Sequence, residues 1–596
     1  MVIFMDRAMI EIFIGLLIGA VLYFTKSYMG IGIAFSCFLC YLIILKIAKL
    51  KRYLTLVILG FTLVSFINCY LYFEINNPNA NAKVRIIEVK GNYYIGNYKN
   101  KRIRVFTNLY KNKLELGRKY LISGSFEKKP DNSKGIIGNY YLNSYVSLKE
   151  DLIYKGYKLR DSLYNKLSLV LDEDKAGTIL ALSFGDSSYI NYDGREKFNL
   201  LGISHIISVS GLHITLIFEV LKKLFGIKLS LLSLFLYVIF TGGKAATIRA
   251  FIMIILINMS LNVRRKYESI SALSFAAFII LLIRPYSLLD SGYVLSFLSV
   301  AGIIILQNKL ERYFYKLPSF IRTSLSLTVS SMVFTIPYMI FIFKRISIGG
   351  LISNFLLVPF YTALIVLGLS LFIFMKVPLI FNCLIYVISS IFIIINEIEL
   401  FLMSILPMPL EFTYIHGVMI LFLYLSYLLI IRGYNSLKYL PLVFMILILK
   451  ENYIIYPEIN FIAGKKSDII QVIYDNKNIM VSGEKVKLKY VYEDYGKVNK
   501  IYDEFEDELF ISLDKKYFLR VKKLGNSLSL SFIYKNKEIK FISKENLDKL
   551  GDEAIEAFLS SNYDIIEVEK NGSVVNGRYY GTYKIIGGKA YFNYIN

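Results

Sequence analysis

Two histidines and three serines gather in one short apolar segment, and their side chains are the ones best suited to chemistry. The segment reads Gly202-Ile-Ser-His-Ile-Ile-Ser-Val-Ser-Gly-Leu-His213, and it holds two of the 3 histidines of the chain. Polar groups at membrane depth are costly unless they face a bundle interior or a water-filled path. Gly211 directly follows Ser210 and lets a helix break, which frees carbonyls that only a wet cavity tolerates. The segment therefore indicates a conduit.

Charged residues enter the apolar segments that follow. The stretch from Thr241 to Ala250 contains Lys244 and Arg249, and Asp290 opens a later stretch. Cations in a pore would offset the desolvation of a passing phosphate chain. The plainer alternative is that Lys244 reaches an interface and that serine and histidine bridge helices. We expect the pore to be lined by His205, Ser208, Ser210, Gly211, His213, Arg249 and Asp290.

Three specific kinds of site are alternatives to a conduit: a zinc site, a serine hydrolase site and a nucleotide-binding loop. A zinc site needs a third ligand, but His205 and His213 would lie about 80° apart on a helix with no other ligand close in sequence. An intramembrane serine hydrolase would use Ser210 as nucleophile and His416 as base, and this stays our alternative function. The Gly242-Gly243-Lys244 triplet lacks the spacing and the Ser/Thr of a nucleotide loop. We expect no cofactor and no metal.

The composition tells what kind of protein positions these residues. Of the 596 residues, 55% are hydrophobic, and the mean hydropathy is +0.51, which indicates a polytopic α-helical membrane protein. Residues 1–78 contain three apolar runs, near 8–24, 31–47 and 54–73, and no signal-peptide cleavage site. Basic residues crowd the loop between the second and third runs, so this loop is cytoplasmic and the chain after it emerges outside.

Residues 79–150 alternate short strand-like runs with Gly/Asn turns, which predicts an extracytoplasmic OB-like β-barrel. Between Ala80 and Glu150 there are 15 basic and 5 acidic residues with aromatic residues among them, a pattern typical of single-strand binding. The alternative is a solvated basic face near anionic lipid. The expected DNA-binding residues are Tyr98, Lys99, Lys101, Arg102, Arg104 and Phe106.

The rest of the chain divides into three parts. We expect an amphipathic connector over 151–198, and a polytopic membrane domain over 199–450 with about seven to nine further passes or half-passes. Residues 451–596 are polar and alternate like strands, which predicts a second soluble domain of α/β or α+β type.

Four segments, in order, resemble the signature of the ComEC family of bacterial DNA-internalisation channels. They are Gly202 to Ile214, Arg249-Ala250, Leu289 to Gly302 and Ser353 to Pro359. The resemblance implies passage of one DNA strand through the bacterial cytoplasmic membrane during transformation. It also implies a DNA receptor and a cytoplasmic motor ATPase as partners beside single-stranded DNA and membrane lipid. A separate nuclease and a second copy of the chain are further partners to consider.

The tail departs from the family. The segment Asn460 to Asp468 looks like a worn copy of the turn that opens the family's β-lactamase-like α/β domain, and Val568 to Ser573 resembles a later motif without its histidines. No histidine follows His416, whereas a metallo-β-lactamase site depends on several imidazoles to hold its metals. We therefore expect a degenerate, metal-free domain and a protein that is not an enzyme.

Overall fold

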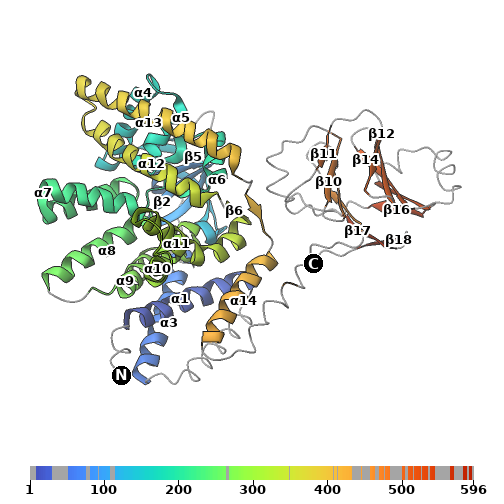
Figure 1. The fold of residues 1–596 in the computed structure, drawn as a ribbon, viewed down its shortest axis with the longest axis horizontal. Coiled ribbons are helices and arrows are strands. Elements are labelled where there is room, and N and C mark those ends of the chain that lie inside the picture. The colour runs from blue at the N-terminus through green and yellow to red at the C-terminus, as the bar shows by residue number, and fades with distance from the viewer. Residues whose placement is uncertain are drawn as a thin grey trace. The chain divides into compact units, whose positions relative to one another are not determined.

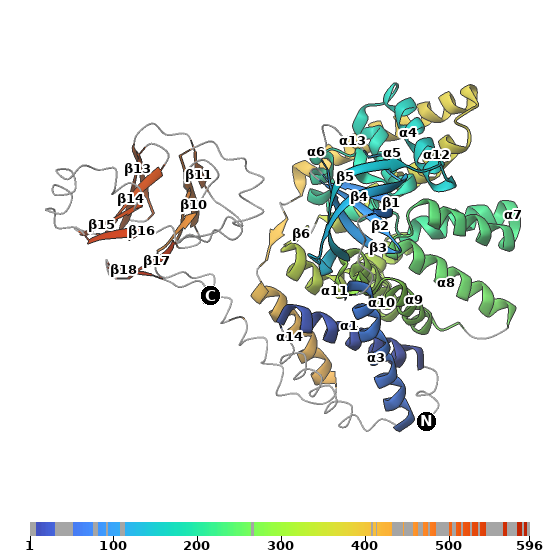
Figure 2. The same cartoon turned by 180° about the vertical axis from the view of Figure 1, so that it is seen from behind.

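The computed structural model describes residues 8–431 except 30–51, 75–80, 91–92, 108–113, 264–266, 348, 407–408 and 413, then residue 445 and stretches between 457 and 592. Two compact units result, Met1–Phe412 and Thr413–Asn596. Figure 1 and Figure 2 show the first unit as helices gathered around a small barrel, and the second as strands with one labelled helix, α14.

Two N-terminal helices, α1 (Ala8–Met29) and α3 (Arg52–Glu74), pack tightly along each other. Glycine makes this approach possible, since a Cβ on Gly19 would lie 2.1 Å from the carbonyl oxygen of Thr62. Both helices are long and apolar enough to cross a membrane, as predicted. The helix predicted over 31–47 lies outside the described residues.

The predicted β-barrel is confirmed. Its strands are β1 (Asn81–Lys90), β2 (Tyr93–Tyr98), β3 (Lys101–Phe106), β4 (Lys119–Glu127) and β5 (Ile136–Ser147). They close in the order β1-β2-β3-β5-β4, and β3 and β5 form the one parallel pair of the barrel. This is the order of a five-stranded OB-type barrel. Alternation along β3 buries Ile103 and Val105 in the barrel core and turns Arg104 and Phe106 outward.

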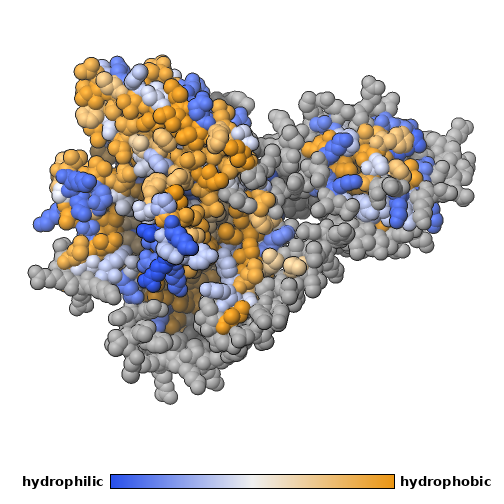
Figure 3. All heavy atoms as spheres, viewed as in Figure 1, coloured by the Kyte–Doolittle hydropathy of each residue, from blue (hydrophilic) through white to orange (hydrophobic). Residues whose placement is uncertain are grey.

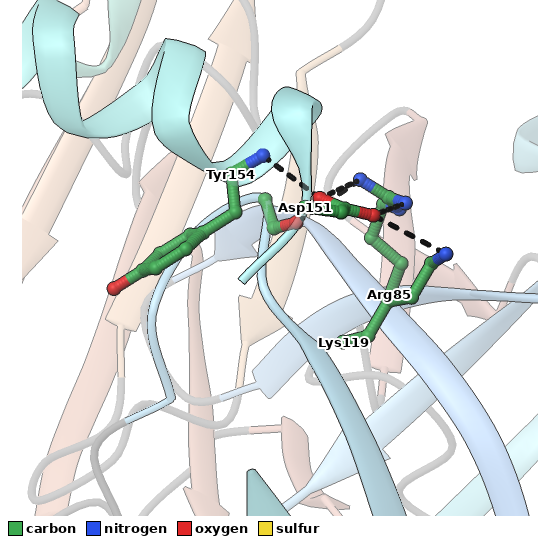
Figure 4. A network of polar contacts seen from close by, with 5 residues as sticks. Arg85, Lys119, Asp151 and Tyr154 are labelled. Carbon is green, nitrogen blue, oxygen red and sulfur yellow. Dashed lines mark hydrogen bonds and ion pairs between the residues drawn. The ribbon is translucent and has the colours of Figure 1, made fainter. Parts of the chain in front are cut away.

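A polar network joins the barrel to α4 (Leu152–Ser168), the helix that follows it (Figure 4). Asp151 caps this helix by accepting from the Tyr154 N–H at 3.0 Å, and it pairs with Arg85 on β1 and Lys119 on β4. Burial alone would raise the pKa of the Asp151 carboxyl. The bonds from Tyr154, Arg85 and Lys119 outweigh burial and lower that pKa to about 2.

Nine further helices complete the first unit: α5 (Glu173–Phe184), α6 (Tyr192–Leu200), α7 (Gly211–Phe240), α8 (Ala245–Asn262), α9 (Ser269–Ile283), α10 (Ser291–Tyr313), α11 (Ser319–Phe343), α12 (Gly350–Ile373) and α13 (Pro378–Ile405). Within the described residues, seven helices are long and apolar enough to span a membrane: α1, α3, α7, α10, α11, α12 and α13. Apolar side chains dominate the visible face over α12 and α13 (Figure 3). The polytopic helical architecture predicted from composition is confirmed.

The described residues of the second unit lie between 414 and 592. This unit contains α14 (Tyr414–Ile431), which the sequence analysis assigns to the polytopic domain. One sheet runs β11-β10-β9-β8-β17-β18 and the other β12-β13-β14-β15-β16, and they share a core in which Phe461 contacts Phe541. The strands are β8 (Glu458–Ile462), β9 (Ile469–Tyr474), β10 (Lys477–Ser482), β11 (Lys500–Tyr502), β12 (Glu508–Ser512), β13 (Tyr517–Leu524), β14 (Ser527–Tyr534), β15 (Lys537–Ser543), β16 (Asp564–Val568), β17 (Gly581–Ile586) and β18 (Lys589–Phe592).

The resemblance of the second unit to β-lactamase-like domains stays a prediction. Asn460 lies on β8 and Val568 ends β16, but residues 463–468 and 569–573 of the two worn motifs lie outside the described residues. No group of three or more His, Cys, Asp or Glu side chains that could hold a metal ion occurs in the described part of the chain.

Candidate nucleic-acid interface and polar cluster

Three aromatic side chains form a patch on the outer face of the barrel. Phe106 on β3 stacks on Tyr141 of β5 with ring centres 5.4 Å apart and planes 16° apart, and Tyr93 of β2 lies 5.8 Å from Phe106. The parallel pairing of β3 and β5 sets Phe106 beside Tyr141, which is 42% exposed. We call Tyr93, Phe106 and Tyr141 the aromatic patch. It offers π-faces on which nucleobases can stack.

Arg104 lies beside the aromatic patch in a fixed position. Its guanidinium is 5.0 Å from the ring centre of Tyr93, and it donates to Asp131 at 3.1 Å and to Asn139 at 3.3 Å. These two partners order the side chain, and Asp131 neutralises part of its charge. Arg104 therefore contributes to the patch mainly as a hydrogen-bond donor in a fixed position, and less as a free positive charge.

Lys101 has a different role from the one that its sequence position predicts. Its side chain is only 7% exposed, and its ammonium donates to the Leu71 carbonyl at 2.7 Å, 5.6 Å from the Tyr72 ring centre. Burial, with a smaller effect of Lys128, lowers the pKa of Lys101. We therefore assign Lys101 to the junction between the barrel and α3, and we do not propose it as a DNA contact.

The barrel is fastened to the helices next to this junction. The Tyr72 hydroxyl donates to the Gly135 carbonyl at 2.9 Å, and Arg102 lies 4.9 Å from the ring centre of Tyr286 in the 3-10 helix η5 (Pro285–Leu289). Gly135 has a φ of 67°, and any Cβ there would lie 2.4 Å from the Tyr286 ring. The helices and η5 thus cover the end of the outer barrel face where Arg102 lies. The aromatic patch lies at the other end of β3.

The last two predicted DNA contacts lie at the turn between β2 and β3. Tyr98 is buried in the barrel core, whereas Lys99 is exposed with its ammonium 5.4 Å from the Tyr98 ring centre. Lys99 adopts a φ of 46° in this tight turn. Only the lysine is available to a phosphate backbone.

The polar cluster of the helical body forms around the first turn of α7. Ser210 is the N-cap, and its N–H donates to His213 Nδ1 at 3.1 Å while its hydroxyl oxygen lies 2.8 Å from the same nitrogen. His213 is 1% exposed, and its Nε2 has no hydrogen-bond partner in the described part of the chain. His205, in the 3-10 turn η4 (Ser204–Ile206), and Ser208 are exposed just before this turn, and the Ser208 hydroxyl donates to the His205 carbonyl at 3.2 Å.

Arg249 of α8 joins this cluster. Its Nη2 lies 2.8 Å from the position that a Cβ would take on Gly211, and its Nε donates to the Ser296 hydroxyl of α10 at 2.9 Å. The structure thus brings Ser210, Gly211, His213 and Arg249 together. Asp290 instead caps α10 by accepting from the Gly292 N–H at 2.8 Å, and within the described residues no hydrogen bond or ion pair joins it to the cluster.

The first family-like segment also meets the start of α12, the helix that holds the fourth. Gly202 lies against Gly350, since a Cβ on Gly202 would lie 2.9 Å from the Gly350 Cα. The Ser347 hydroxyl donates to the Leu200 carbonyl at 2.8 Å in the same region. Segments about 150 residues apart in sequence therefore meet at the start of α12.

Sequence reasoning missed one buried charge in the helical body. Glu399 of α13 accepts from the Tyr361 hydroxyl at 2.6 Å and pairs with Lys197 of α6, beside a cavity of about 240 Å³. The sequence signal that could have revealed Glu399 is a carboxylate within an apolar helix of 28 residues. Tyr141 and Ser296 were missed because the residues that they contact are distant in sequence. They meet these residues only when two strands pair or two helices pack.

Comparison with known proteins adds independent information. Residues 182–436 match the family described as competence protein. The chain is 30% identical over 246 residues to ComE operon protein 3 of Bacillus subtilis (strain 168), a match over 39% of this chain and 30% of that protein. It is 22% identical over 258 residues to Recombination protein 2 of Haemophilus influenzae, over 39% of this chain and 32% of that protein.

A third relative, an uncharacterised protein of Aquifex aeolicus, is 29% identical over 178 residues, or 29% of this chain and 43% of that protein. The matches therefore span between 30% and 43% of the length of these relatives. No solved structure matches the chain.

Proposed function

We propose, from the premise that this chain is a competence-family protein over residues 182–436, that it conducts one strand of DNA across a bacterial membrane during natural transformation. The observation that carries the proposal is the family match over the helices that hold the polar cluster of Ser210, Gly211, His213 and Arg249. A membrane domain that gathers such groups supports a hydrated path for a polyanion better than a purely structural role.

The barrel supplies the receiving surface in this proposal. The aromatic patch gives sequence-independent stacking, while Arg104 and the exposed Lys99 give phosphate contacts. Because the opposite end of β3 is fastened to α3 and η5, a strand bound at the patch stays at a fixed place relative to the helices. Asp290, the cap of α10, directly follows η5 in the chain.

The proposal also covers the membrane in which the helices lie, the second unit and the proteins that act with this chain. The helices would lie in the cytoplasmic membrane, and a receptor and a motor ATPase would deliver and pull the strand. The second unit would be non-enzymatic and metal-free, with a structural or docking role, and degradation of the other strand would fall to a separate nuclease. A second copy of the chain would complete the assembly if one chain does not enclose the path.

One observation favours the alternative function, an intramembrane serine hydrolase. The Ser210 hydroxyl lies 2.8 Å from Nδ1 of His213, not of the predicted base His416, and this is the distance between a nucleophile and its base. The same nitrogen also accepts the Ser210 N–H, so the contact is explained by helix capping. Among the residues that the structure describes, none bonds to His213 Nε2, whereas a catalytic base is normally oriented by a third group.

The test of the proposed function is a deletion with complementation. Cells that lack the gene should take up no labelled DNA into a nuclease-protected cytoplasmic pool, and the intact gene should restore uptake. A double variant, Phe106→Ala with Tyr141→Ala, should restore uptake only in part at equal protein level. Full uptake by the deleted strain would refute a DNA channel.

A further inference from the structure

Arg249 is a buried cation without an acidic partner. Its side chain is 7% exposed, and its contacts are the Ser296 hydroxyl at 2.9 Å, the Met253 sulfur at 3.8 Å and the Phe297 ring centre at 6.0 Å. No carboxylate pairs with it among the residues that the structure describes. Charges buried in proteins are normally paired, because an unpaired one loses its hydration without compensation.

Two other buried charges of the same unit serve as comparisons. Glu399 has the Lys197 ammonium and the Tyr361 hydroxyl. The Nε of Arg160 in α4 has no hydrogen-bond partner within the described residues, but its guanidinium lies 4.2 Å from the Phe240 ring centre and 4.7 Å from that of Tyr157. Arg249 has one more distant ring contact and a single good acceptor. An anion would compensate its charge.

A further buried donor lies in the first turn of α7, the turn that Arg249 of α8 approaches at Gly211. His213 Nδ1 accepts the Ser210 N–H, so a neutral His213 carries its proton on Nε2, and this N–H is buried without a partner among the described residues. The start of α7 adds backbone N–H groups and the positive end of the helix dipole next to the Arg249 guanidinium at Gly211. Guanidinium, imidazole N–H and helix N-terminus are all donors, and the described side chains bring no acid to balance them.

We propose that Arg249 and the first turn of α7 form a binding site for a single phosphate group, with Ser296 as the residue that positions the guanidinium. The inference rests on the proposed function in one respect: a transported strand would present its phosphodiesters to this site. A lipid headgroup carries the same phosphate chemistry and is the other source to distinguish. A site of this kind contacts the phosphodiester backbone of DNA and no base, so it accepts DNA of every sequence.

Thermal unfolding of the purified full chain in a maltoside detergent, which contains no phosphate, tests the site. Millimolar inorganic phosphate should raise the melting temperature above that in chloride of equal ionic strength, increasingly with concentration. The shift should be lost in Arg249→Met. Phosphate also stabilises proteins by exclusion from their surface, and that effect acts on every variant alike.

Arg284→Met is the matched control. Arg284 also lies in the helical body, but it donates to the Gly243 carbonyl at 2.7 Å, which makes it a structural cation. This variant should keep the phosphate shift and melt lower in chloride, whereas Arg249→Met should melt no lower than the parent in chloride because it removes an uncompensated charge. Equal phosphate shifts in all three proteins, or no shift in any, would overturn the site, as would a lower melting temperature of Arg249→Met in chloride.

Two further ligands identify the source of the phosphate. Tetrathymidylate should give a shift that depends on Arg249, and the same tetramer with uncharged methylphosphonate linkages should lose that part of the shift. A shift with phosphatidylglycerol alone would keep the phosphate site and assign it to lipid. Because none of these readouts requires DNA uptake, loss of the site would leave the proposed channel standing, and a failed complementation experiment would leave the site standing.

Discussion

Lys99 and Lys101, two lysines close together on the barrel, allow the proposed DNA contact to be tested separately from structural support. Lys99 is exposed at the turn, whereas Lys101 is buried against Leu71 and Tyr72. Lys99→Gln should lower the salt slope of single-strand binding by about 0.7, the value for one phosphate contact. Lys101→Gln should leave the slope unchanged and lower the melting temperature instead. Fluorescence anisotropy of labelled oligothymidylate at several salt concentrations measures the slope, and a larger change for Lys101 would contradict the assignment.

The aromatic patch should supply salt-independent affinity. Phe106→Ala and Tyr141→Ala should each weaken binding by about 1–3 kcal/mol, the range for a stacked base, with the salt slope intact. Neither residue belongs to the buried core of the barrel, so both variants should fold. Tyr145→Ala is the control, because Tyr145 contacts Tyr120 near the other end of β5. Equal losses for Tyr145 and Phe106 would remove the patch from the binding surface.

Ser210 separates the channel from the hydrolase. Ser210→Ala should cost about 1 kcal/mol of stability through the lost cap and should reduce DNA uptake only in part. Ser210→Leu should block uptake by filling the polar cluster with an apolar side chain. A hydrolase predicts that Ser210→Ala is as damaging as any substitution, with labelling of Ser210 by a fluorophosphonate. Uptake assays at matched protein level, together with that labelling, decide between the two.

Residue types and alternation predicted which face of an element a residue lies on better than they predicted which residues it contacts. The pattern of β3 could place Arg104 and Phe106 on the outer face. It could not show that Lys101 meets the Leu71 carbonyl 30 residues earlier, because that contact depends on how the barrel sits on α3. Similarly, Arg249 could be seen as an intramembrane cation, but Ser296 becomes its partner only when α8 and α10 pack together.

At the scale of elements, the junction of barrel and α4 depends on one carboxylate. The Asp151 pKa of about 2 in the folded protein lies below the roughly 3.9 of an unfolded aspartate. The group therefore stabilises the fold above the unfolded pKa, and this contribution is lost as the pH falls toward 2. Asp151→Asn keeps a good cap but removes the charge, so its melting temperature should fall less between pH 5 and pH 2 than that of the parent.

The measurement is thermal unfolding of the full chain at each pH, with hydrogen exchange of the Tyr154 amide as the local readout. Asp131→Asn, which removes the partner of Arg104, serves as a second acidic control on the barrel. An identical acid dependence in parent and Asp151→Asn would mean that the network of Figure 4 does not set the stability of this junction.

Elements with strong periodicity were predictable, and their interruptions were less so. Alternating strands with Gly/Asn turns predict the barrel, and long apolar runs predict the spanning helices. The sequence places a helix break at Gly211, where α7 begins, and the apolar run is interrupted again near Gly226, where the helix has a non-helical φ of 73°. Lys222, Lys223 and Lys228 surround that kink, but the sequence alone does not show that one helix continues on both sides of it.

At the scale of the whole chain, fixed contacts join the β-barrel of the first unit to its apolar helices. Tyr72, Lys101, Gly135 and Tyr286 make that junction, and the family match covers most of the helices beyond it. Length, hydropathy and charge could predict that the chain contains a barrel and membrane helices. The seating of the barrel on η5 depends on side-chain contacts between segments more than 150 residues apart, which no local pattern encodes.

The most direct test of a strand path is photo-crosslinking during uptake. A photoreactive amino acid would replace Phe106 in the aromatic patch, Ser208 before α7, or Leu379, an exposed residue at the start of α13. Labelled DNA recovered covalently bound at positions 106 and 208, but not at 379, is the result that the channel account predicts. DNA that reaches the cytoplasm of the same cells without crosslinking at 106 or 208 would contradict it.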